Sequence, residues 1–459
     1  MADKLQITFW SGVETVTGAN FLLEDSKTRI LVDCGLLQGI PDSGVENRKP
    51  FPYDVKTIDF LFITHAHMDH IGRVCKLVRD GFRGTIYSTP ETKELSNVMI
   101  LDALKVMDMN SRQVTDGPKE PPLYEMSDFN QAFSQWKEIP YHTETKISDE
   151  FSVYLKDAGH ILGSSMYEFK HGGKKIVFTG DSGNSPAPLL KDTEKITDAD
   201  YLIVDSVYGD RNHESKSERD ARFKKIVTET IKNNGALIIP AFSIERTQVI
   251  LYELNNLVEE KQIPSVPIFL DSPLGAKVTG IYSRTTRDFN SGVQGEIKGG
   301  DDIFNFPKLS VTHGFRDSQE IVKTANPKII IAGSGMSSGG RVVSHEVHFL
   351  PDPKSTILLM GYQAVGTLGR RIQDKPKEVE INGSMVPVKA RIEMISGYSS
   401  HKDSNGIVDM VADTAGNVKK VFVVMGEPKS SSYLAQRLRD ELEVDAVCPE
   451  RGKVYVLDK

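Results

Sequence analysis

The stretch Thr64-His65-Ala66-His67-Met68-Asp69-His70 is the most informative feature of this chain. It places three imidazoles and a carboxylate at positions 65 to 70, directly after the apolar run Phe60-Leu61-Phe62-Ile63. This order predicts a buried strand whose end presents metal ligands at the edge of a sheet. Zinc takes nitrogen and carboxylate ligands in near-tetrahedral arrays, and one zinc cannot use all of these groups together with the distant partners described below. The spacing therefore predicts two neighbouring metal ions; the alternative is a histidine-rich surface loop.

Composition is typical of a soluble globular protein. The 459 residues are 39% hydrophobic and 26% charged, enough chain for two or more domains. No secretory signal and no membrane-spanning apolar run are visible, and the odd cysteine count predicts reduced thiols and a cytoplasmic location. The net charge of -7 means that a phosphate-bearing substrate would need the metals or a locally positive groove.

Polar residues follow apolar strands at several points along the chain. Asp33, Asp181 and Asp205 each stand at or just after the end of a predicted strand. Strand ends that converge on one rim can build a site. From Ala236 onward, strands alternate with helices and predict a separate parallel-sheet layer, and from about Lys389 the first pattern returns. The simplest organisation is one domain interrupted by another.

Further residues can complete a metal site. His160 lies between glycines, and a carboxylate at Asp181 could bridge two cations with one oxygen each. Asp33 is assigned as the acceptor that orients a ligand histidine. Taken alone, His160 could be a packed core histidine, and the two aspartates could serve only to form turns. Together with the cluster at residues 65 to 70, they are better explained as parts of a metal site. The predicted metal ligands are His65, His67, Asp69, His70, His160 and Asp181.

This set resembles the metallo-β-lactamase superfamily, an αββα sandwich with a zinc pair at one edge. Asp205, and His401 in Ser399-Ser400-His401-Lys402-Asp403, resemble the residues that flank the inserted domain of the β-CASP nucleases. The resemblance covers nearly the whole chain and is to the RNA-processing members, which include the mRNA 3′-end cleavage endonuclease and its prokaryotic relatives. It implies an α/β fold in which residues 1–207 and 386–459 form the metallo-β-lactamase sandwich and residues 208–385 an inserted, parallel-sheet β-CASP domain.

Two glycine-rich loops of the inserted domain, 333–341 and 361–370, are similar to loops of these RNA-processing members. Without a Cβ, backbone N–H groups can approach phosphate oxygens, and a following helix N-terminus adds partial positive charge. The alternative is ordinary strand-to-helix turns with solvated arginines, and Tyr362 could either stack on a base or pack. The substrate-binding candidates are Ser334, Gly335, Gly339, Gly340, Arg341, Tyr362, Gly366 and Arg370.

The resemblance implies a zinc-dependent ribonuclease that acts on single-stranded RNA. Two zinc ions about 3.5–4 Å apart would activate a hydroxide that attacks the phosphodiester. His401 would protonate the leaving oxygen, Asp205 would orient His401, and Asp69 joins them as the third catalytic candidate. The family implies products with 5′-phosphate and 3′-hydroxyl ends. Endonuclease or 5′-to-3′ exonuclease action, and a homodimer, stay open.

One departure from the pattern bears on the second zinc. The RNA-processing members carry a histidine in a Val-His-Gly-Glu setting, where this chain has Val424-Met425-Gly426-Glu427. A thioether is a poorer zinc ligand than an imidazole, which predicts weaker binding at the second site. The DNA-processing branch also lacks this histidine. The alternatives are therefore a DNA nuclease of the same superfamily or a non-catalytic RNA-binding partner; the inserted domain disfavours a small-molecule hydrolase.

Overall fold

The computed structural model describes residues 4–40, 42–113 and 121–457. The chain forms two compact units. The first consists of Met1–Ser185, Asp192–Asn212 and His401–Lys459, and the second, here called the inserted unit, of Pro186–Lys191 and His213–Ser400. The predicted organisation, in which a second domain interrupts the first, is therefore confirmed. The boundaries predicted after residues 207 and 385 stay a prediction.

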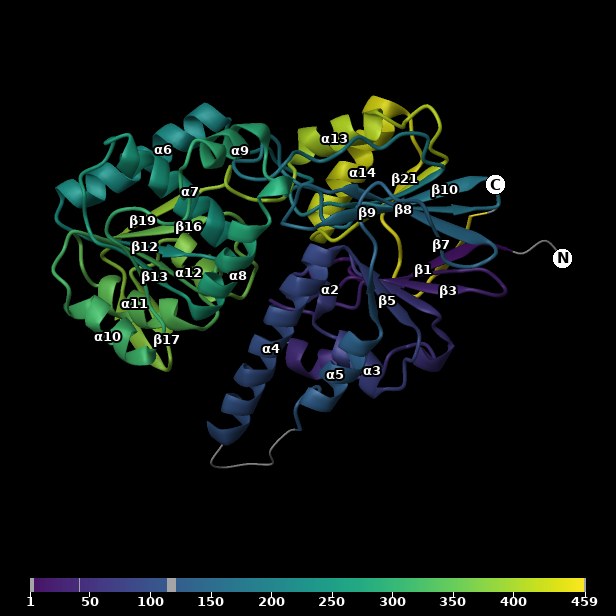
Figure 1. Ribbon diagram of the computed structural model, residues 1–459, viewed down its shortest axis with the longest axis horizontal. Helices are drawn as coiled ribbons and strands as arrows, with labels where there is room; N and C mark the ends of the chain where they lie inside the picture. The colour runs from purple at the N-terminus through teal and green to yellow at the C-terminus, as the bar shows by residue number, and fades with distance from the viewer. Residues whose placement is uncertain (1–3, 41, 114–120, 458–459) are drawn as a thin grey trace. The chain divides into compact units, whose positions relative to one another are not determined.

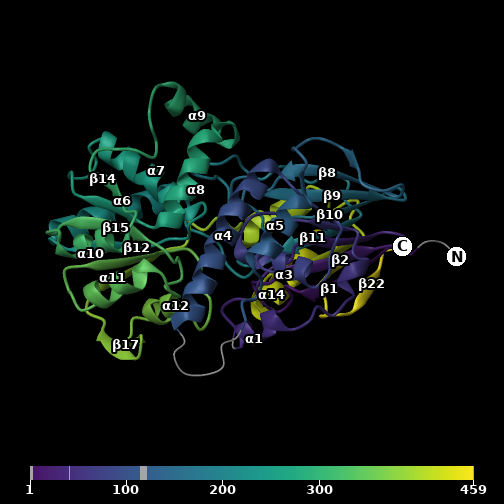
Figure 2. The ribbon, with the colours of Figure 1, turned by 60° about the horizontal axis from the view of Figure 1, so that its bottom comes forward.

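The first unit contains two sheets. The order of strands in one is β22 (Val454–Val456), β1 (Gln6–Ser11), β2 (Asn20–Glu24), β3 (Arg29–Val32), β4 (Phe60–Phe62), β5 (Thr85–Ser88) and β6 (Trp136–Glu138). The order in the other is β21 (Ala446–Val447), β20 (Lys420–Val424), β11 (Tyr201–Asp205), β10 (Lys174–Phe178), β9 (Ser165–His171), β8 (Phe151–Asp157) and β7 (Thr145–Lys146). Strands β8, β9 and β10 run side by side in Figure 2.

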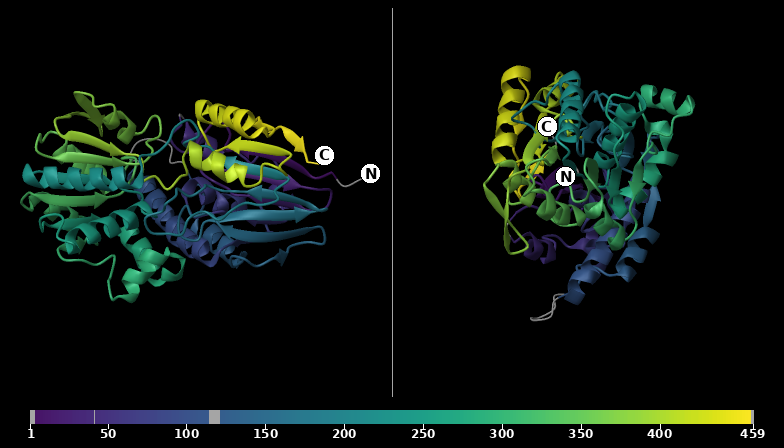
Figure 3. Two further views of the ribbon diagram at one scale, coloured as in Figure 1. Left: turned by 90° about the horizontal axis from the view of Figure 1, so that it is seen from above. Right: turned by 90° about the vertical axis from the view of Figure 1, so that its left-hand side faces the viewer.

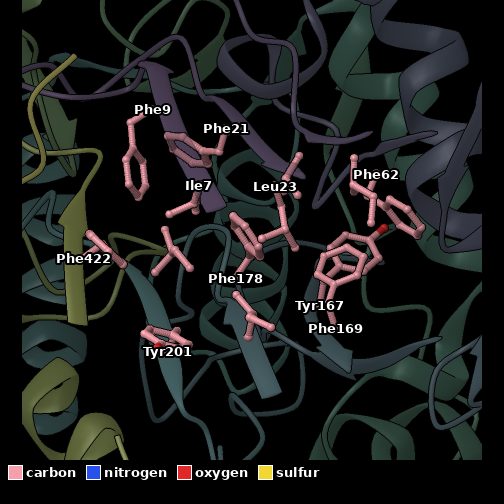
Figure 4. Close-up of a cluster of buried hydrophobic side chains, with 14 of the residues drawn as sticks. Ile7, Phe9, Phe21, Leu23, Phe62, Tyr167, Phe169, Phe178, Tyr201 and Phe422 are labelled. Atoms are coloured by element: carbon pink, nitrogen blue, oxygen red, sulfur yellow. The ribbon is translucent and has the colours of Figure 1, made fainter. Parts of the chain in front are cut away.

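A buried core with side chains from both sheets joins them into a sandwich (Figure 4). Successive strand residues point to opposite faces. Phe21 and Leu23 of β2 therefore enter this core, while Leu22 is buried on the other face. Phe62 of β4 meets Phe169 of β9 with ring centroids 5.0 Å apart. Packing across the sandwich thus fixes β4 immediately before the histidine cluster.

Helices cover the outer faces of the sandwich. On the side of the first sheet lie α1 (Ser43–Arg48), α2 (Met68–Ile71), α3 (Val74–Arg79), α4 (Pro90–Gln113) and α5 (Met126–Ser134). On the second sheet, α13 (Ser404–Ala412) and α14 (Pro428–Leu442) share a buried cluster with β11 and β20, and Figure 3 shows both in yellow. The layers are helix, sheet, sheet, helix, which confirms the predicted αββα class.

The inserted unit is built on a parallel sheet. Its strand order is β14 (Leu309–Val311), β13 (Ile268–Asp271), β15 (Lys328–Ala332), β12 (Ala236–Pro240), β16 (Thr356–Met360) and β19 (Arg391–Ile395). A small hairpin, β17 (Glu378–Ile381) with β18 (Ser384–Pro387), precedes β19. Strand β19 lies beyond the boundary predicted after residue 385, yet it pairs with β16.

Helices flank both faces of this sheet. Helices α10 (Phe315–Lys323), α11 (Arg341–Phe349) and α12 (Leu368–Gln373) share one buried cluster with the strands. Helices α6 (Lys216–Lys232) and α7 (Arg246–Glu259) lie on the opposite side of the strands in Figure 1, and α7 contacts α8 (Pro273–Arg284), which α9 (Ser291–Lys298) follows. Ser215 and Glu218 form a capping box that begins α6. Within the described ranges, no helix is long and apolar enough to cross a membrane.

Candidate metal centre

The topology of the first unit brings distant residues to one edge of the sandwich. Strands β10, β11 and β20 are parallel, and β8 runs in the same direction because β9 is antiparallel to both of its neighbours. Their carboxyl ends therefore share an edge, which carries Asp181, Asp205 and, in the turn after β8, His160. From the other sheet, the backbone carbonyl of Thr64, next to His65, accepts a hydrogen bond from the Ser165 amide at 2.8 Å.

One group of side chains has the geometry of a tetrahedral site. Ligands about 2.0–2.2 Å from a zinc ion lie roughly 3.3–3.6 Å from one another. His67 Nδ1 lies 3.1 Å from His65 Nε2 and 3.2 Å from His160 Nε2. Asp181 Oδ2 lies 3.4 Å from His65 Nε2 and 3.5 Å from His160 Nε2. These four residues can converge on a single cation.

A second group shares Asp181 with the first. His70 Nε2 lies 3.4 Å from Asp181 Oδ1 and 3.7 Å from Asp69 Oδ2, while Asp181 Oδ2 faces the first group. The two oxygens of Asp181 thus point at different ligand sets, as a bridging carboxylate would. Within the described chain, the buried atoms His70 Nε2 and Asp181 Oδ1 have no hydrogen-bond partner. Orphaned buried groups of this chemistry fit a metal ion.

Asp33 orients His70. Its Oδ2 lies 2.7 Å from His70 Nδ1, so the other ring nitrogen, Nε2, faces the candidate metal. The Thr64 amide and hydroxyl both donate to Asp33 at 2.8 Å. This is the arrangement in which a carboxylate fixes the tautomer and direction of a ligand imidazole.

Two glycines permit the close approach of the segments that carry the ligands. A Cβ at Gly35 would lie 1.5 Å from the Asp69 carbonyl oxygen. Gly180 has a φ of +58° and packs where a Cβ would lie 2.7 Å from Cβ of Thr64. A larger residue at either position would push apart the backbone next to a ligand.

Burial dominates the electrostatics of the ligands. It lowers the pKa of His65 well below its usual value, which favours the neutral imidazole that binds metals. Burial alone would also lower the pKa of His70, but Asp181 and then Asp33 outweigh it and hold that pKa well above the usual value. Burial raises the pKa of Asp69 to about 6, whereas the charges of His70 and His65 outweigh burial and hold the pKa of Asp181 well below its ordinary value. The carboxylates that favour a proton on His70 would equally favour a metal cation there.

His401 and Asp205 adjoin the ligands. His401 Nδ1 lies 3.8 Å from Oδ2 of both Asp205 and Asp181. The Ser182 amide donates to Asp205 Oδ1 at 3.1 Å, and the Lys402 amide donates to the Ser182 carbonyl at 2.8 Å. Burial would lower the pKa of His401, but the nearby carboxylates of Asp205 and Asp181 raise it. The His401 side chain is 20% exposed, so a protonated imidazole there can reach a ligand outside.

Met425 lies at the end of β20 and packs in the core of the sandwich. It is 2% exposed, and its amide donates to the Gly12 carbonyl at 2.8 Å. Its sulfur occupies the space beside Gly12, where a Cβ would come within 2.7 Å. Together with Asp33, Thr64 and His70, Met425 lines a small, mostly apolar cavity.

The loops predicted to bind substrate lie in the inserted unit, at the carboxyl ends of β15 and β16. The Ser334 hydroxyl closes its own loop, because it accepts from the Ser338 amide at 3.0 Å. Gly339 and Gly340 have positive φ values of 145° and 73°, and Gly340 precedes α11. Gly335 packs on the side chain of Phe242, and a Cβ there would lie 2.5 Å from Cδ2 of that ring.

The second loop joins β16 to α12. Gly366 is exposed with a φ of 89°, Tyr362 is half-buried, and Thr367 caps the helix by accepting from the Arg370 amide. Arg370 Nη1 donates to the Gln363 carbonyl at 3.3 Å. Arg341 and Arg370 are both candidates for binding substrate, yet each also makes hydrogen bonds inside the inserted unit.

The residues that hold Arg341 were not predicted from the sequence. Its Nη1 donates to Asp271 Oδ1 at 2.6 Å and to the Thr312 hydroxyl at 2.8 Å. Asp271 is 0% exposed, and its Oδ2 also accepts from Ser318 Oγ at 2.5 Å and lies 2.7 Å from His345 Nε2. Asp271 ends a strand and Thr312 follows one, which is the signal that revealed Asp181 and Asp205.

Comparisons with known proteins agree with this architecture. Residues 22–198 match the metallo-beta-lactamase superfamily domain, residues 247–372 the Beta-Casp domain, and residues 385–449 the Zn-dependent metallo-hydrolase RNA specificity domain. A solved structure of a protein of unknown function from Enterococcus faecalis is similar in fold, with a TM-score of 0.55 and 12% identity over 99% of this chain and 100% of that one.

Curated relatives narrow the family. The ribonuclease TTHA0252 of Thermus thermophilus is 32% identical over 95% of this chain and 96% of its own length. An RNase J-like protein of Methanocaldococcus jannaschii is 29% identical over 98% and 99%, and the transcription termination factor FttA of Methanosarcina mazei is 29% identical over 96% and 70%. The chain belongs to the β-CASP branch of the metallo-β-lactamase superfamily. It is accordingly a metal-dependent hydrolase, and its resemblance to the RNA-processing members is confirmed.

Proposed function

We propose that the protein is a zinc-dependent ribonuclease that hydrolyses phosphodiester bonds of single-stranded RNA and leaves 5′-phosphate and 3′-hydroxyl ends. One observation carries the proposal. Asp181 directs Oδ2 at His65 and His160 and Oδ1 at His70, so a single carboxylate joins two ligand sets. Paired metal sites of this kind suit the displacement at phosphorus in a phosphodiester.

The side chains divide into two sets of metal ligands. His65, His67 and His160 with Asp181 would hold one zinc, and Asp69 and His70 with the same Asp181 would hold the other. Bound zinc lowers the pKa of water and so supplies a hydroxide nucleophile near neutral pH. Asp33 keeps His70 in the required tautomer through its 2.7 Å contact with Nδ1.

His401 supplies the proton in this proposal. Its raised pKa favours the imidazolium, and Asp205, held by the Ser182 amide, is the nearby carboxylate that stabilises the charge. The imidazolium donates its proton to the leaving oxygen, and Asp205 keeps the ring directed at the site. Loss of Asp205 should therefore lower the pKa of His401 as well as the rate.

RNA is the substrate class that the relatives support. The relative with 32% identity is a ribonuclease, and residues 385–449 match an RNA specificity domain. The loops at 333–341 and 361–370 would meet the phosphates of the substrate through backbone amides and Arg341.

The three cysteines, Cys34, Cys75 and Cys448, are free thiols in the described chain, which supports a cytoplasmic location.

The second zinc should bind more weakly than the first. Asp69, His70 and Asp181 offer it three protein ligands, and the side chain at position 425 is a thioether buried in the core. The same methionine motivates the rival proposal of a DNA nuclease, which therefore requires a direct comparison of the two nucleic acids.

The test is cleavage of 5′-labelled single-stranded RNA, and of DNA with the same sequence, by the purified full chain with zinc. We expect RNA cleavage, abolished by His67→Ala and slowed about 10²–10⁴-fold by His401→Ala. His142→Ala is the matched control, because His142 is 56% exposed and pairs with Glu194 at the surface. RNA cleavage that survives His67→Ala would refute the proposal, and faster cleavage of DNA would favour the rival.

A further inference from the structure

Phe315, the first residue of α10, exposes most of its surface to solvent. It is 67% exposed, whereas the buried face of α10 consists of Ser318 and Ile321. Among the large hydrophobic side chains that the described chain exposes, only Phe315 and Tyr433 are aromatic. An exposed phenyl ring leaves a flat apolar face open to a ligand.

A fixed cation contacts the backbone just before α10. Arg341 Nη2 lies 3.4 Å from the carbonyl of His313, which is two residues before Phe315. Asp271 holds the guanidinium at 2.6 Å and, through its other oxygen, holds Ser318, one helical turn after Phe315. One buried carboxylate therefore ties the start of α10 to the start of α11, and the two helices lie side by side in Figures 1 and 2.

The surroundings of this pair suit an anionic ligand. Phe315 and Arg341 follow the carboxyl ends of β14 and β15, the edge at which open parallel sheets bind ligands. Arg316, the next residue of α10, is also exposed and adds positive charge to this end of the helix. The nearest acid on the helix, Asp317, spends Oδ2 on the backbone amides of His313 and Gly314.

We infer that Phe315 stacks on the base of one unpaired nucleotide while the anchored Arg341 contacts its phosphate. This subsite rests on the proposed function, since it names how a single-stranded RNA substrate is held. A free aromatic face accepts any base that is not already stacked in a duplex, so the contact selects for single strands and not for sequence. Asp271 acts through Arg341 and is a positioning residue.

Binding of a fluorescein-labelled ten-nucleotide oligoadenylate, measured by anisotropy, tests the inference. The full chain with zinc carries His401→Ala so that the RNA stays intact. We expect Phe315→Ala and Phe315→Leu to weaken binding roughly 5- to 100-fold, and Phe315→Trp to bind as well as the parent. Tyr433→Ala, which removes the other exposed aromatic side chain, should change binding less than about twofold.

Two further measurements separate stacking from other roles. An oligomer without bases should bind the parent and Phe315→Ala equally. Arg341→Ala should reduce the slope of log affinity against log salt by about 0.7, while Phe315→Ala leaves it unchanged. If Phe315→Leu binds RNA like the parent, the ring serves only as an apolar side chain and the inference is overturned. If Phe315→Ala changes the sedimentation of the protein, the ring lies in an interface between copies, which would overturn the inference as well. If the parent binds and cleaves RNA but Phe315→Ala changes nothing, the inference fails alone. If the parent chain binds no RNA, the proposed function fails as well.

Discussion

In the first unit, the carboxyl ends of β10 and β11 carry Asp181 and Asp205. The ion-pair partners of both carboxylates are imidazoles of histidine residues. In the inserted unit, β13 also ends in a buried aspartate, but Asp271 is surrounded by donors from Arg341, Thr312 and Ser318. The same edge of a parallel arrangement thus prepares one unit for a cation and the other for an anion.

The contrast shows that the fold places a carboxylate at the end of a strand, while the side chains around that carboxylate decide whether the site suits a cation or an anion. Asp181 Oδ1 lacks a hydrogen-bond partner among the described residues, so it can take a metal. Both oxygens of Asp271 already have hydrogen-bond partners, so this carboxylate positions the guanidinium of Arg341 and does not bind a metal.

The largest effect should come from Asp181→Ala. Because both ligand sets lose a member, we expect the loss of both metals and a fall in RNA cleavage of at least about 1000-fold. Elemental analysis of the purified variant and the cleavage assay measure the two losses together. A variant that retains two metal ions per chain would contradict the bridging role.

The inserted unit should respond to pH at Glu346, on α11. Burial raises the pKa of Glu346 from 4.5 to about 8, and its neighbour Ser337 lies in the loop 333–341. The folded state therefore binds this proton more tightly than the unfolded chain does. The stability it contributes is full below about pH 4.5 and is lost as the pH rises toward 8, by about 3 kcal/mol between pH 5 and 8.

Glu346→Gln tests this prediction, because the amide keeps the shape of the side chain without the titration. Denaturant unfolding of the inserted unit at a series of pH values should show a slope for the parent and a flatter profile for the variant. Equal slopes would show that Glu346 is not the group responsible.

A smaller effect is expected for Asp33→Asn. The amide weakens the hold on His70 Nδ1, and the loss of such a partner costs about 10–100-fold in metal affinity. Competition with a chelator measures the affinity of the weaker site. Asp25→Asn is the matched control, because Asp25 pairs with His171 at 2.9 Å outside the ligand set. Similar losses in both variants would mean general destabilisation.

The smallest change should be a gain from Met425→His. An imidazole at the end of β20 would offer the second zinc a fourth protein ligand, and we expect about tenfold tighter binding there. Met425→Leu should leave the affinity unaltered, since it replaces the thioether with an apolar side chain of similar size. Chelator titration of the two variants decides between a ligand effect and a packing effect.

The family resemblance implied the sandwich, and the candidate ligands could be proposed from the sequence because their signals are local. His65 to His70 crowd one turn, and Asp181 ends a recognisable apolar strand. The neighbours of Arg341 escaped prediction for the opposite reason. Asp271, Thr312 and Arg341 are far apart in sequence, and only the strand order β14-β13-β15 brings them together. The exposure of Phe315 was not predicted, because the first residue of a helix can point either to the core or to solvent and the sequence does not distinguish the two.

The order in which the chain is synthesised has a consequence for the site. Every candidate metal ligand precedes residue 182, but His401 follows the whole inserted unit, and β20, which pairs with β11, follows His401. A nascent chain therefore contains every candidate metal ligand long before it contains the proposed proton donor, His401, and the second sheet is complete only after residue 447.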